Sequence, residues 1–182
     1  MVTFEMKKIL AIIGSASENS ANQRLIEFLA NQTEKDFEWT IFNELKSLPH
    51  FDPELSVNNP PKEVISLREQ IEQADGIIIC TPEYVFSIPS GLKNAIEWCV
   101  STTVFSDKPC GLITASAQGE KAHEELQLIM RTLMAQFIDE TTLLISGIKG
   151  KISESGEVND PETKLKFVRF RKSFSELLTE CK

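Results

Sequence analysis

Short apolar runs alternate along this chain with stretches in which apolar residues recur every three or four positions. The runs predict β-strands, and their nearly continuous apolar character is expected of strands that are covered on both faces. The predicted strands span residues 8–13, 38–42, 76–80, 109–115 and 137–145. Strands that alternate with helices of this length predict an α/β fold in which helices cover both faces of a parallel sheet.

The stretches between the runs have helical periodicity. They predict helices over residues 20–31, 61–74, 90–100 and 121–136, and a last helix over 165–178. Ser20 and Gln23 have the spacing of a capping box at the start of the first helix. Trp98 lies away from the apolar stripe of its helix, which therefore offers a contact surface for a second subunit.

Two segments predict irregular structure. Residues 43–60 contain three prolines and are expected to form a surface loop. Residues 149–160 are rich in glycine, serine and charge, and are expected to form a loop or a small hairpin. A chain of 182 residues is expected to form one domain with a substantial core.

Five predicted strands suit the flavodoxin-like order 2-1-3-4-5, in which ligands bind where the strand order reverses, between the first and third strands. Loops at the carboxyl ends of these two strands would then lie side by side. Both loops have unusual sequences, and together they indicate a bound nucleotide cofactor.

Composition and charge narrow the range of partners. The net charge of −8 and the pI near 4.9 argue against a nucleic acid or an anionic membrane as a partner. The four cysteines are scattered without a C-x-x-C pair, and there are two histidines, so neither a metal site nor a disulfide framework is expected. Cys80 ends a predicted strand and is expected in the core. No apolar stretch approaches the length of a membrane span, which favours a cytoplasmic protein.

The loop after the first strand has the chemistry of a phosphate site. It reads GSASENSAN over residues 14–22 and leads into a helix, whose N-terminus offers free N–H groups and a positive dipole end. Ser15, Ser17, Ser20 and Asn22 add short polar side chains, whereas residues 14–23 contain no lysine or arginine. The pattern is neither G-x-G-x-x-G nor a Walker A sequence. An ordinary polar turn is an equally good interpretation of this loop alone.

The loop after the third strand could border a flat ring. Pro82 and Pro89 stiffen it, and Tyr84 and Phe86 lie between them. The alternative is that both aromatic side chains pack in the core. A third loop, residues 115–119, is small and polar and could close the other side of a flat ligand, although an ordinary turn explains it equally well. His123 is expected to be an ordinary polar residue near the start of a helix and not a catalytic base.

These segments resemble a known family. The 14–22 loop, the sequence TPEY at residues 81–84, and LKNAIEW at residues 92–98 resemble the NADPH-dependent FMN reductases, a flavodoxin-like family that includes quinone, azo-dye and chromate reductases. The resemblance covers about residues 7–145, and residues 81–98 are its specific part.

The resemblance implies three groups of FMN-binding residues. The phosphate group would be held by Ser15, Ser17, Ser20, Asn22 and Gln23. The isoalloxazine ring would lie against Pro82, Glu83, Tyr84, Val85, Phe86 and Ser87. The facing loop would consist of Ser116, Ala117, Gln118 and Gly119. The chain departs from the family where many members carry arginine in place of Ser17, asparagine in place of Val85, and a second glycine in place of Glu120.

The implied activity is a reductase that passes electrons from NADPH or NADH through FMN to a small acceptor such as a quinone, a flavin, an azo compound or a metal oxyanion. Such chemistry needs no catalytic acid, base or nucleophile from the protein, and a homodimer or homotetramer is implied. Two alternatives remain open: a flavodoxin-type electron carrier without NADPH turnover, and a domain that has lost FMN and serves as an interaction partner. Tyr84 and Phe86 share one loop and residues 115–119 contain no aromatic, which leaves one ring face open and favours the enzyme.

Overall fold

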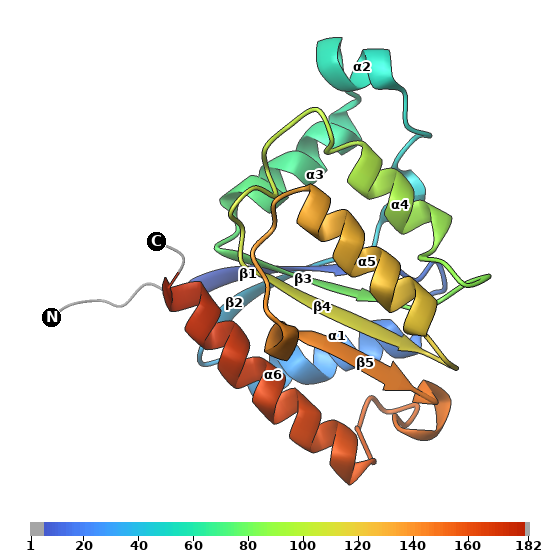
Figure 1. The fold of residues 1–182 in the computed structure, drawn as a ribbon, viewed down its shortest axis with the longest axis vertical. Coiled ribbons are helices and arrows are strands. Elements are labelled where there is room, and N and C mark those ends of the chain that lie inside the picture. Colours follow the sequence, from blue (N-terminus) through green and yellow to red (C-terminus); the bar gives the residue numbers. More distant parts are fainter. Residues whose placement is uncertain (1–5, 181–182) are drawn as a thin grey trace, which may run out of the picture.

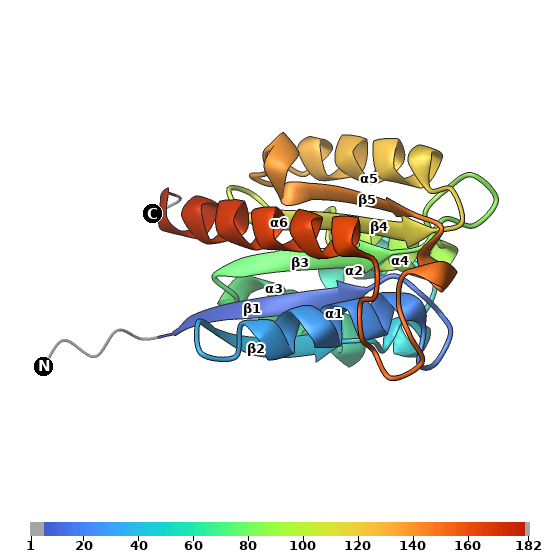
Figure 2. The same ribbon diagram turned by 90° about the horizontal axis from the view of Figure 1, so that it is seen from below.

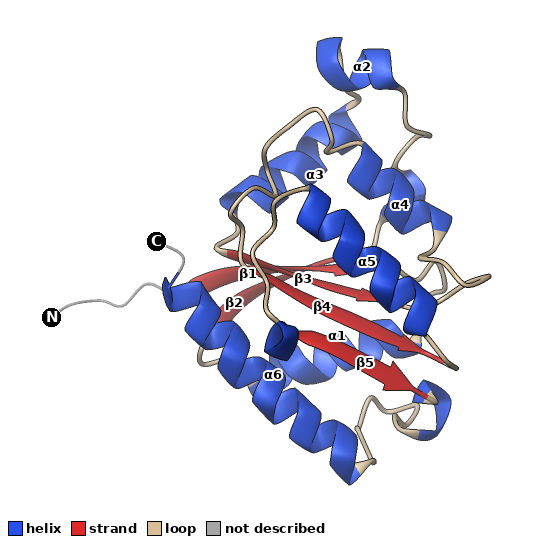
Figure 3. Ribbon diagram, in the orientation of Figure 1, coloured by secondary structure: helices blue, strands red, loops and turns tan. Residues whose placement is uncertain are grey.

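The computed structural model describes residues 6–180 and contains one five-stranded sheet in the order β2-β1-β3-β4-β5 (Figures 1 and 3). Every neighbouring pair of strands is parallel. The strands are β1 (Lys7–Ile13), β2 (Phe37–Phe42), β3 (Gly76–Thr81), β4 (Cys110–Ser116) and β5 (Thr142–Ser146). The predicted fold class and strand order are therefore confirmed.

Helices cover both faces of this sheet, with α1 and α6 on one face and α3, α4 and α5 on the other (Figures 1 and 2). The α-helices are α1 (Ala21–Gln32), α2 (Pro53–Asn58), α3 (Lys62–Gln73), α4 (Ser90–Glu97), α5 (Glu120–Thr132) and α6 (Pro161–Glu180). Three 3-10 turns are η1 (Leu45–Ser47), η2 (Asp139–Thr141) and η3 (Ile148–Gly150). Among residues 6–180, no helix combines the length and the apolar character that crossing a membrane requires.

A hydrophobic core lies on each side of the sheet, between the sheet and the helices that cover that face. Alternate side chains of the inner strands pack into one core and then the other. In β1, Ile9 and Ala11 pack on the side of α1 and α6, whereas Leu10 and Ile12 pack on the side of α3, α4 and α5. All four side chains are at most 2% exposed. This double burial is the physical reason for the continuous apolar run in the sequence.

Strand register brings the three unusual loops to one edge of the sheet. Ile13 pairs with Cys80, and Thr81 pairs with Thr114, so β1, β3 and β4 end at neighbouring positions. The Gly14 N–H donates to the Cys80 carbonyl at 2.8 Å. A Cβ at Gly14 would lie 2.4 Å from Thr81 Oγ1, so only glycine allows the first loop to approach β3 this closely.

Residues 43–60 are more ordered than the sequence predicts. The segment contains η1 and the short helix α2 instead of a continuous surface loop. The Asp52 side chain caps α2 by accepting hydrogen bonds from Glu54 N at 2.9 Å and Leu55 N at 3.0 Å, and Pro53 occupies the first helical position. This Asp-Pro start is a recognised helix signal, so the local sequence favours the turn that forms.

The ends of three predicted elements were wrong. Helix α4 ends at Glu97 and α5 ends at Thr132, in each case earlier than predicted. The predicted start of the fifth strand is occupied instead by η2, and β5 begins at Thr142. Met134 has a left-handed φ of 60°, which ends the helical path, and its carbonyl accepts from Asp107 N at 2.9 Å. A tertiary contact therefore determines where this connection leaves the helix.

Trp98 is buried, so it cannot make its helix a contact surface, and the reason given for that prediction was wrong. Its indole is 0% exposed, and its Nε1–H donates to the Pro49 carbonyl at 2.8 Å. The ring also packs edge-on against Phe51, with centroids 5.4 Å apart. Trp98 directly follows α4 and contacts the 43–60 segment, which covers the side chain that would otherwise face solvent.

Three cysteines, Cys80, Cys99 and Cys110, are buried free thiols, and Cys181 lies outside the described residues. The predicted core position of Cys80 is confirmed, with an exposed fraction of 0%. Burial raises the pKa of the Cys99 and Cys110 thiols to about 12, so neither is a reactive thiolate.

Within residues 6–180, no three His, Cys, Asp or Glu side chains lie close enough together to hold a metal ion.

Candidate functional site

The β1–α1 loop presents hydroxyl groups and the N-terminus of α1. Ser15 is buried, and its Oγ accepts a hydrogen bond from Ser17 N at 3.3 Å. Ser20 is the N-cap and accepts from Gln23 N at 3.1 Å, which confirms half of the predicted capping box. The Gln23 side chain donates to Glu27 instead of to the cap backbone. The remaining N–H groups of this first turn have no partner within the helix and are suited to an anion.

Asn22 lies beneath this loop and not at its surface. Its side chain is 4% exposed and donates to the Ala115 carbonyl at 3.2 Å. Its oxygen accepts a hydrogen bond from the Cys80 thiol, with the heavy atoms 3.3 Å apart. Asn22 therefore joins the first turn of α1 to the ends of β3 and β4, and it fixes the spacing between the first and third loops.

The β3–α4 loop forms a two-residue turn whose apolar tip is exposed. Tyr84 and Ser87 exchange backbone hydrogen bonds of 2.9 and 3.1 Å around this turn. Tyr84, Val85 and Phe86 are 45%, 94% and 70% exposed. The interpretation in which both aromatic side chains pack in the core is therefore excluded, and these residues are available to a ligand or to another protein surface.

The turn holds two non-glycine residues in the left-handed region, with φ of 53° at Val85 and 59° at Phe86. Positive φ at both central residues defines a type I′ turn, which favours asparagine and glycine. A β-branched side chain such as Val85 is strained there.

We expect Val85→Asn to raise the free energy of unfolding by about 1 kcal/mol, because asparagine tolerates this conformation. Urea denaturation followed by circular dichroism measures the change.

Val85→Thr is the matched control for this prediction. Threonine is also β-branched but carries a polar group, so the strain remains while the apolar surface shrinks. A similar gain in both variants would show that polarity, and not relief of backbone strain, is responsible.

Glu83 links the second loop to the third loop and to the start of α5. Its carboxylate accepts from Gly119 N at 3.3 Å and from Ala122 N at 3.0 Å. The Glu83 carbonyl accepts from Ser116 Oγ at 3.4 Å. A carboxylate at the N-terminus of a helix is stabilised by the free N–H groups and by the helix dipole. Glu83 therefore acts from outside the helix as the cap that Gly119 cannot provide.

Glu125 anchors the other end of the second loop. Its Oε2 atom accepts from Ser87 Oγ at 2.7 Å and from Ile88 N at 2.9 Å. Both hydrogen bonds are charge-assisted, and such bonds are stronger than neutral ones. Glu83 of the loop is bound to the start of α5, and Glu125 of α5 is bound to Ser87 and Ile88, so the two ends of the loop are fixed and the apolar tip lies between them.

The third loop is held from the side of β5. The Gln118 carbonyl accepts from Ser146 Oγ at 2.8 Å, and the Ala117 carbonyl accepts from Gly147 N at 3.1 Å. Gly119 has a φ of 102°, where a side chain would be strained. Ala117 and Gln118 remain exposed, so this loop offers small and polar groups to a ligand.

His123 lies under the third loop, with Nδ1 2.9 Å from Thr114 Oγ1. Burial lowers the pKa of His123, and the negative charge of Glu124 opposes this effect more weakly.

Because the unfolded chain binds the His123 proton more tightly than the folded chain does, we expect stability to fall as the pH drops through about 6.5. Urea midpoints at pH 8 and pH 5 measure this loss. The loss should be smaller in His123→Gln, and an equal loss in both proteins would assign the pH dependence to other groups.

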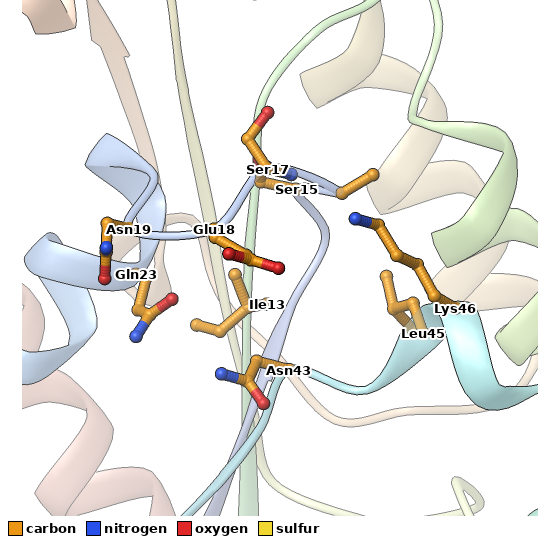
Figure 4. Close-up of a pocket in the computed structure, with 10 residues that line it drawn as sticks. Ile13, Ser15, Ser17, Glu18, Asn19, Gln23, Asn43, Leu45 and Lys46 are labelled. Atoms are coloured by element: carbon orange, nitrogen blue, oxygen red, sulfur yellow. The ribbon is translucent and has the colours of Figure 1, made fainter.

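A cavity of about 350 Å³ opens beside the first loop, on the side of β2 (Figure 4). Three of the predicted phosphate residues, Ser15, Ser17 and Gln23, line it. Asn43 and Lys46 form its opposite wall, and sequence reasoning missed both. Both residues lie in the segment that was predicted to be a surface loop, where no local pattern marked them.

Comparison with known proteins identifies the family of this chain. The sequence profile described as NADPH-dependent FMN reductase matches residues 7–149. The chain belongs to the NADPH-dependent FMN reductase family. It is accordingly an NAD(P)H-dependent oxidoreductase of the flavodoxin-like class, and the resemblance noted in the sequence is confirmed.

Two relatives support the assignment, and one solved structure shares the fold. The chain is 34% identical to the NADH:(hydroxy)cinnamate reductase subunit CrdA of Vibrio ruber, with 94% of this chain and 90% of the relative covered. It is 30% identical to a quinone reductase of Escherichia coli K12, with 87% and 88% covered. Its fold matches that of FerB, an NAD(P)H:(acceptor) oxidoreductase from Paracoccus denitrificans, with a TM-score of 0.79, 23% identity, and 96% and 98% of the two chains covered.

Proposed function

We propose that this reductase binds FMN across the three loops at the carboxyl edge of the sheet. The phosphate lies at the β1–α1 loop, and the ring lies between the 82–87 and 116–119 loops. The observation that carries the proposal is the register of β1, β3 and β4, which places the three loops side by side at the reversal of strand order.

The residues present fit this cofactor. Gly14 lets the first loop lie against β3, and the start of α1 supplies neutral N–H and hydroxyl donors for a phosphate. The proposed phosphate residues are Ser15, Ser17, Ser20, Asn22 and Gln23, with Asn22 acting by positioning the first turn. The exposed side chains of Tyr84 and Phe86 supply apolar surface for a flat ring.

Bound FMN supplies the hydride and electron transfer that protein side chains cannot perform. The chain would bind and orient its ligands. Tyr84 and Ser87 use their N–H groups within the turn, so the backbone N–H groups of Glu83, Val85 and Phe86 would stabilise negative charge on the reduced ring. Residues 116–119 contain no aromatic side chain, so they leave room on the ring for a nicotinamide and then for an acceptor. No side chain is required as an acid, base or nucleophile.

The acceptor we propose is a small planar molecule, with quinones as the leading class. This rests on the relative named quinone reductase and on the relative named as a subunit of a (hydroxy)cinnamate reductase. We also propose a cytoplasmic homodimer or homotetramer, in which the apolar tip at residues 84–86 is available for contact with a second subunit.

Reduction of bound flavin by a nicotinamide tests the proposal. The purified protein is saturated with FMN, freed of excess, and its visible spectrum is recorded before and after anaerobic addition of NADPH or NADH. We expect the absorbance near 450 nm to bleach within seconds and to return on addition of benzoquinone.

Two other outcomes would contradict the proposal. Retained flavin that stays oxidised with both nucleotides would indicate a flavodoxin-type electron carrier. Failure to retain FMN, together with no oxidation of NADPH when free FMN is supplied, would indicate a domain that has lost the cofactor and serves as an interaction partner.

A further inference from the structure

The proposed phosphate loop lacks a positive charge. Residues 14–23 contain no lysine or arginine, and Glu18 adds a carboxylate to the same loop. The whole chain carries a net charge of −8, so the overall field also disfavours an anion. Phosphate ligands are bound more strongly by charge-assisted hydrogen bonds than by neutral donors. A nearby cation would offset this deficit.

Arg24 does not face the cavity that opens beside the loop. Its guanidinium donates to the Asn19 carbonyl, which supports the left-handed backbone at Asn19, where φ is 51°. Arg24 is also absent from the residues that line the cavity. Its guanidinium therefore supports the loop backbone at Asn19 and is not part of the cavity lining.

Lys46 lies on the opposite wall of the cavity, and its amino group points toward the backbone of the first loop (Figure 4). Lys46 is exposed. Its amino group takes part in none of the ion pairs within residues 6–180, so no carboxylate of that range lies within 4.0 Å of it. Glu18 also lines the cavity, so it and Lys46 are the two charged groups of its lining.

The backbone that carries Lys46 is fixed in place. Leu45 and Leu48 on either side of it are buried, at 5% and 7% exposed. The Leu48 N–H donates to the Leu45 carbonyl at 3.3 Å, which closes the η1 turn. Leu45 also packs against Gly91 of α4. The approach is close enough that a Cβ atom added to Gly91 would lie 3.6 Å from the Leu45 Cβ. The lysine side chain thus extends from a stable base toward the cavity.

We propose that Lys46 binds the 5′-phosphate of FMN and supplies the positive charge that the first loop lacks. This inference rests on the FMN binding proposed above. Lys46 comes from the β2–α2 connection, on the far side of β1 from the ring loop, so it reaches the phosphate end of the cofactor and leaves the ring free. A flexible ammonium can meet a phosphate without a fixed geometry.

The experiment compares two flavins that differ in the phosphate. Dissociation constants of the apoprotein for FMN and for riboflavin are measured by fluorescence titration in the wild type and in Lys46→Gln. We expect the variant to bind FMN about tenfold more weakly, the effect of losing one charge-assisted hydrogen bond, with riboflavin binding unchanged. The weakening of FMN binding by added KCl should also be smaller in the variant.

Two further variants make the test specific. Glu18→Gln removes the opposing charge from the cavity, and we expect it to tighten FMN binding and leave riboflavin binding unchanged. Lys62→Gln removes an exposed lysine outside the cavity, where the side chain is 91% exposed, and should leave both affinities unchanged. Circular dichroism of each variant checks that the fold is intact.

The outcomes are distinguishable. Equal changes for FMN and riboflavin in Lys46→Gln, or no change for either, would overturn the role of Lys46. An unchanged FMN affinity with weaker use of NADPH but not of NADH would assign Lys46 to the 2′-phosphate of NADPH and would also overturn it. If the wild type binds neither flavin, the proposed function itself fails.

Discussion

Trp98→Ala is expected to lower the free energy of unfolding by about 3 to 5 kcal/mol, the range for truncating a large buried aromatic side chain. The indole is fully buried, packs edge-on against Phe51, and donates to the Pro49 carbonyl. Its removal leaves a large cavity and removes the packing of the indole on the 43–60 segment, which Asn94 still joins to α4 through hydrogen bonds with Pro49 and Phe51. Urea denaturation followed by circular dichroism at 222 nm measures the loss without relying on tryptophan fluorescence.

Trp98→Phe separates the hydrogen bond from the packing. The Pro49 carbonyl also accepts from Asn94 Nδ2 at 2.9 Å, so it keeps a partner when the indole N–H is lost. We expect a loss of about 1 to 2 kcal/mol, clearly less than in the alanine variant. A loss below about 1 kcal/mol in Trp98→Ala would contradict the burial of this side chain.

Glu83→Ala is expected to have the largest effect on flavin binding among single changes in the loops. The carboxylate joins the second loop to Gly119 and Ala122, so its loss frees the two loops that we propose border the ring and uncaps α5. We expect FMN affinity to fall by about tenfold or more, and stability to fall by about 1 kcal/mol, as for other lost caps. Equilibrium titration with FMN and thermal unfolding of the apoprotein measure the two effects.

Glu83→Gln and a riboflavin titration complete this test. The glutamine oxygen can accept one of the two hydrogen bonds without a charge, so we expect an intermediate affinity. Since Glu83 holds the loops proposed for the ring and does not lie in the loop proposed for the phosphate, riboflavin binding should weaken as much as FMN binding. Loss of FMN binding alone would place the effect at the phosphate and would contradict the role of Glu83 in holding the two loops.

The sequence predicted the strands better than the connections. Buried parallel strands need apolar residues at nearly every position, and this pattern identifies them without any knowledge of their neighbours. The ends of α4 and α5 depend on contacts with distant segments, such as the hydrogen bond from Asp107 N to the Met134 carbonyl. Helical periodicity carries no information about such contacts, so both helices were predicted too long.

In the candidate site too, the sequence predicted the positions of the loops but not the burial of their side chains. The glycine and serine residues of the first loop and the prolines of the second follow their strands directly, so the chain order placed them correctly at the sheet edge. The distinction between exposed and buried aromatics could not be made locally. Tyr84 and Phe86 are exposed because the 84–87 turn projects from the edge, whereas Trp98 is buried because residues 49–51 cover it.

By itself, then, the sequence determined the fold class and the three loops, because each depends on residue patterns within short segments. The strand order was predicted from the flavodoxin-like arrangement that five such strands suit. Only the tertiary structure decided that Lys46 lines the cavity beside the 14–22 loop, that Glu83 and Glu125 hold the 82–87 loop, and that Trp98 belongs to the core. The hydrogen bonds of Glu125, Glu83 and Trp98 join residues 38, 39 and 49 positions apart in the chain. Their meeting results from the packing of helices on the sheet, which no local pattern of residues encodes.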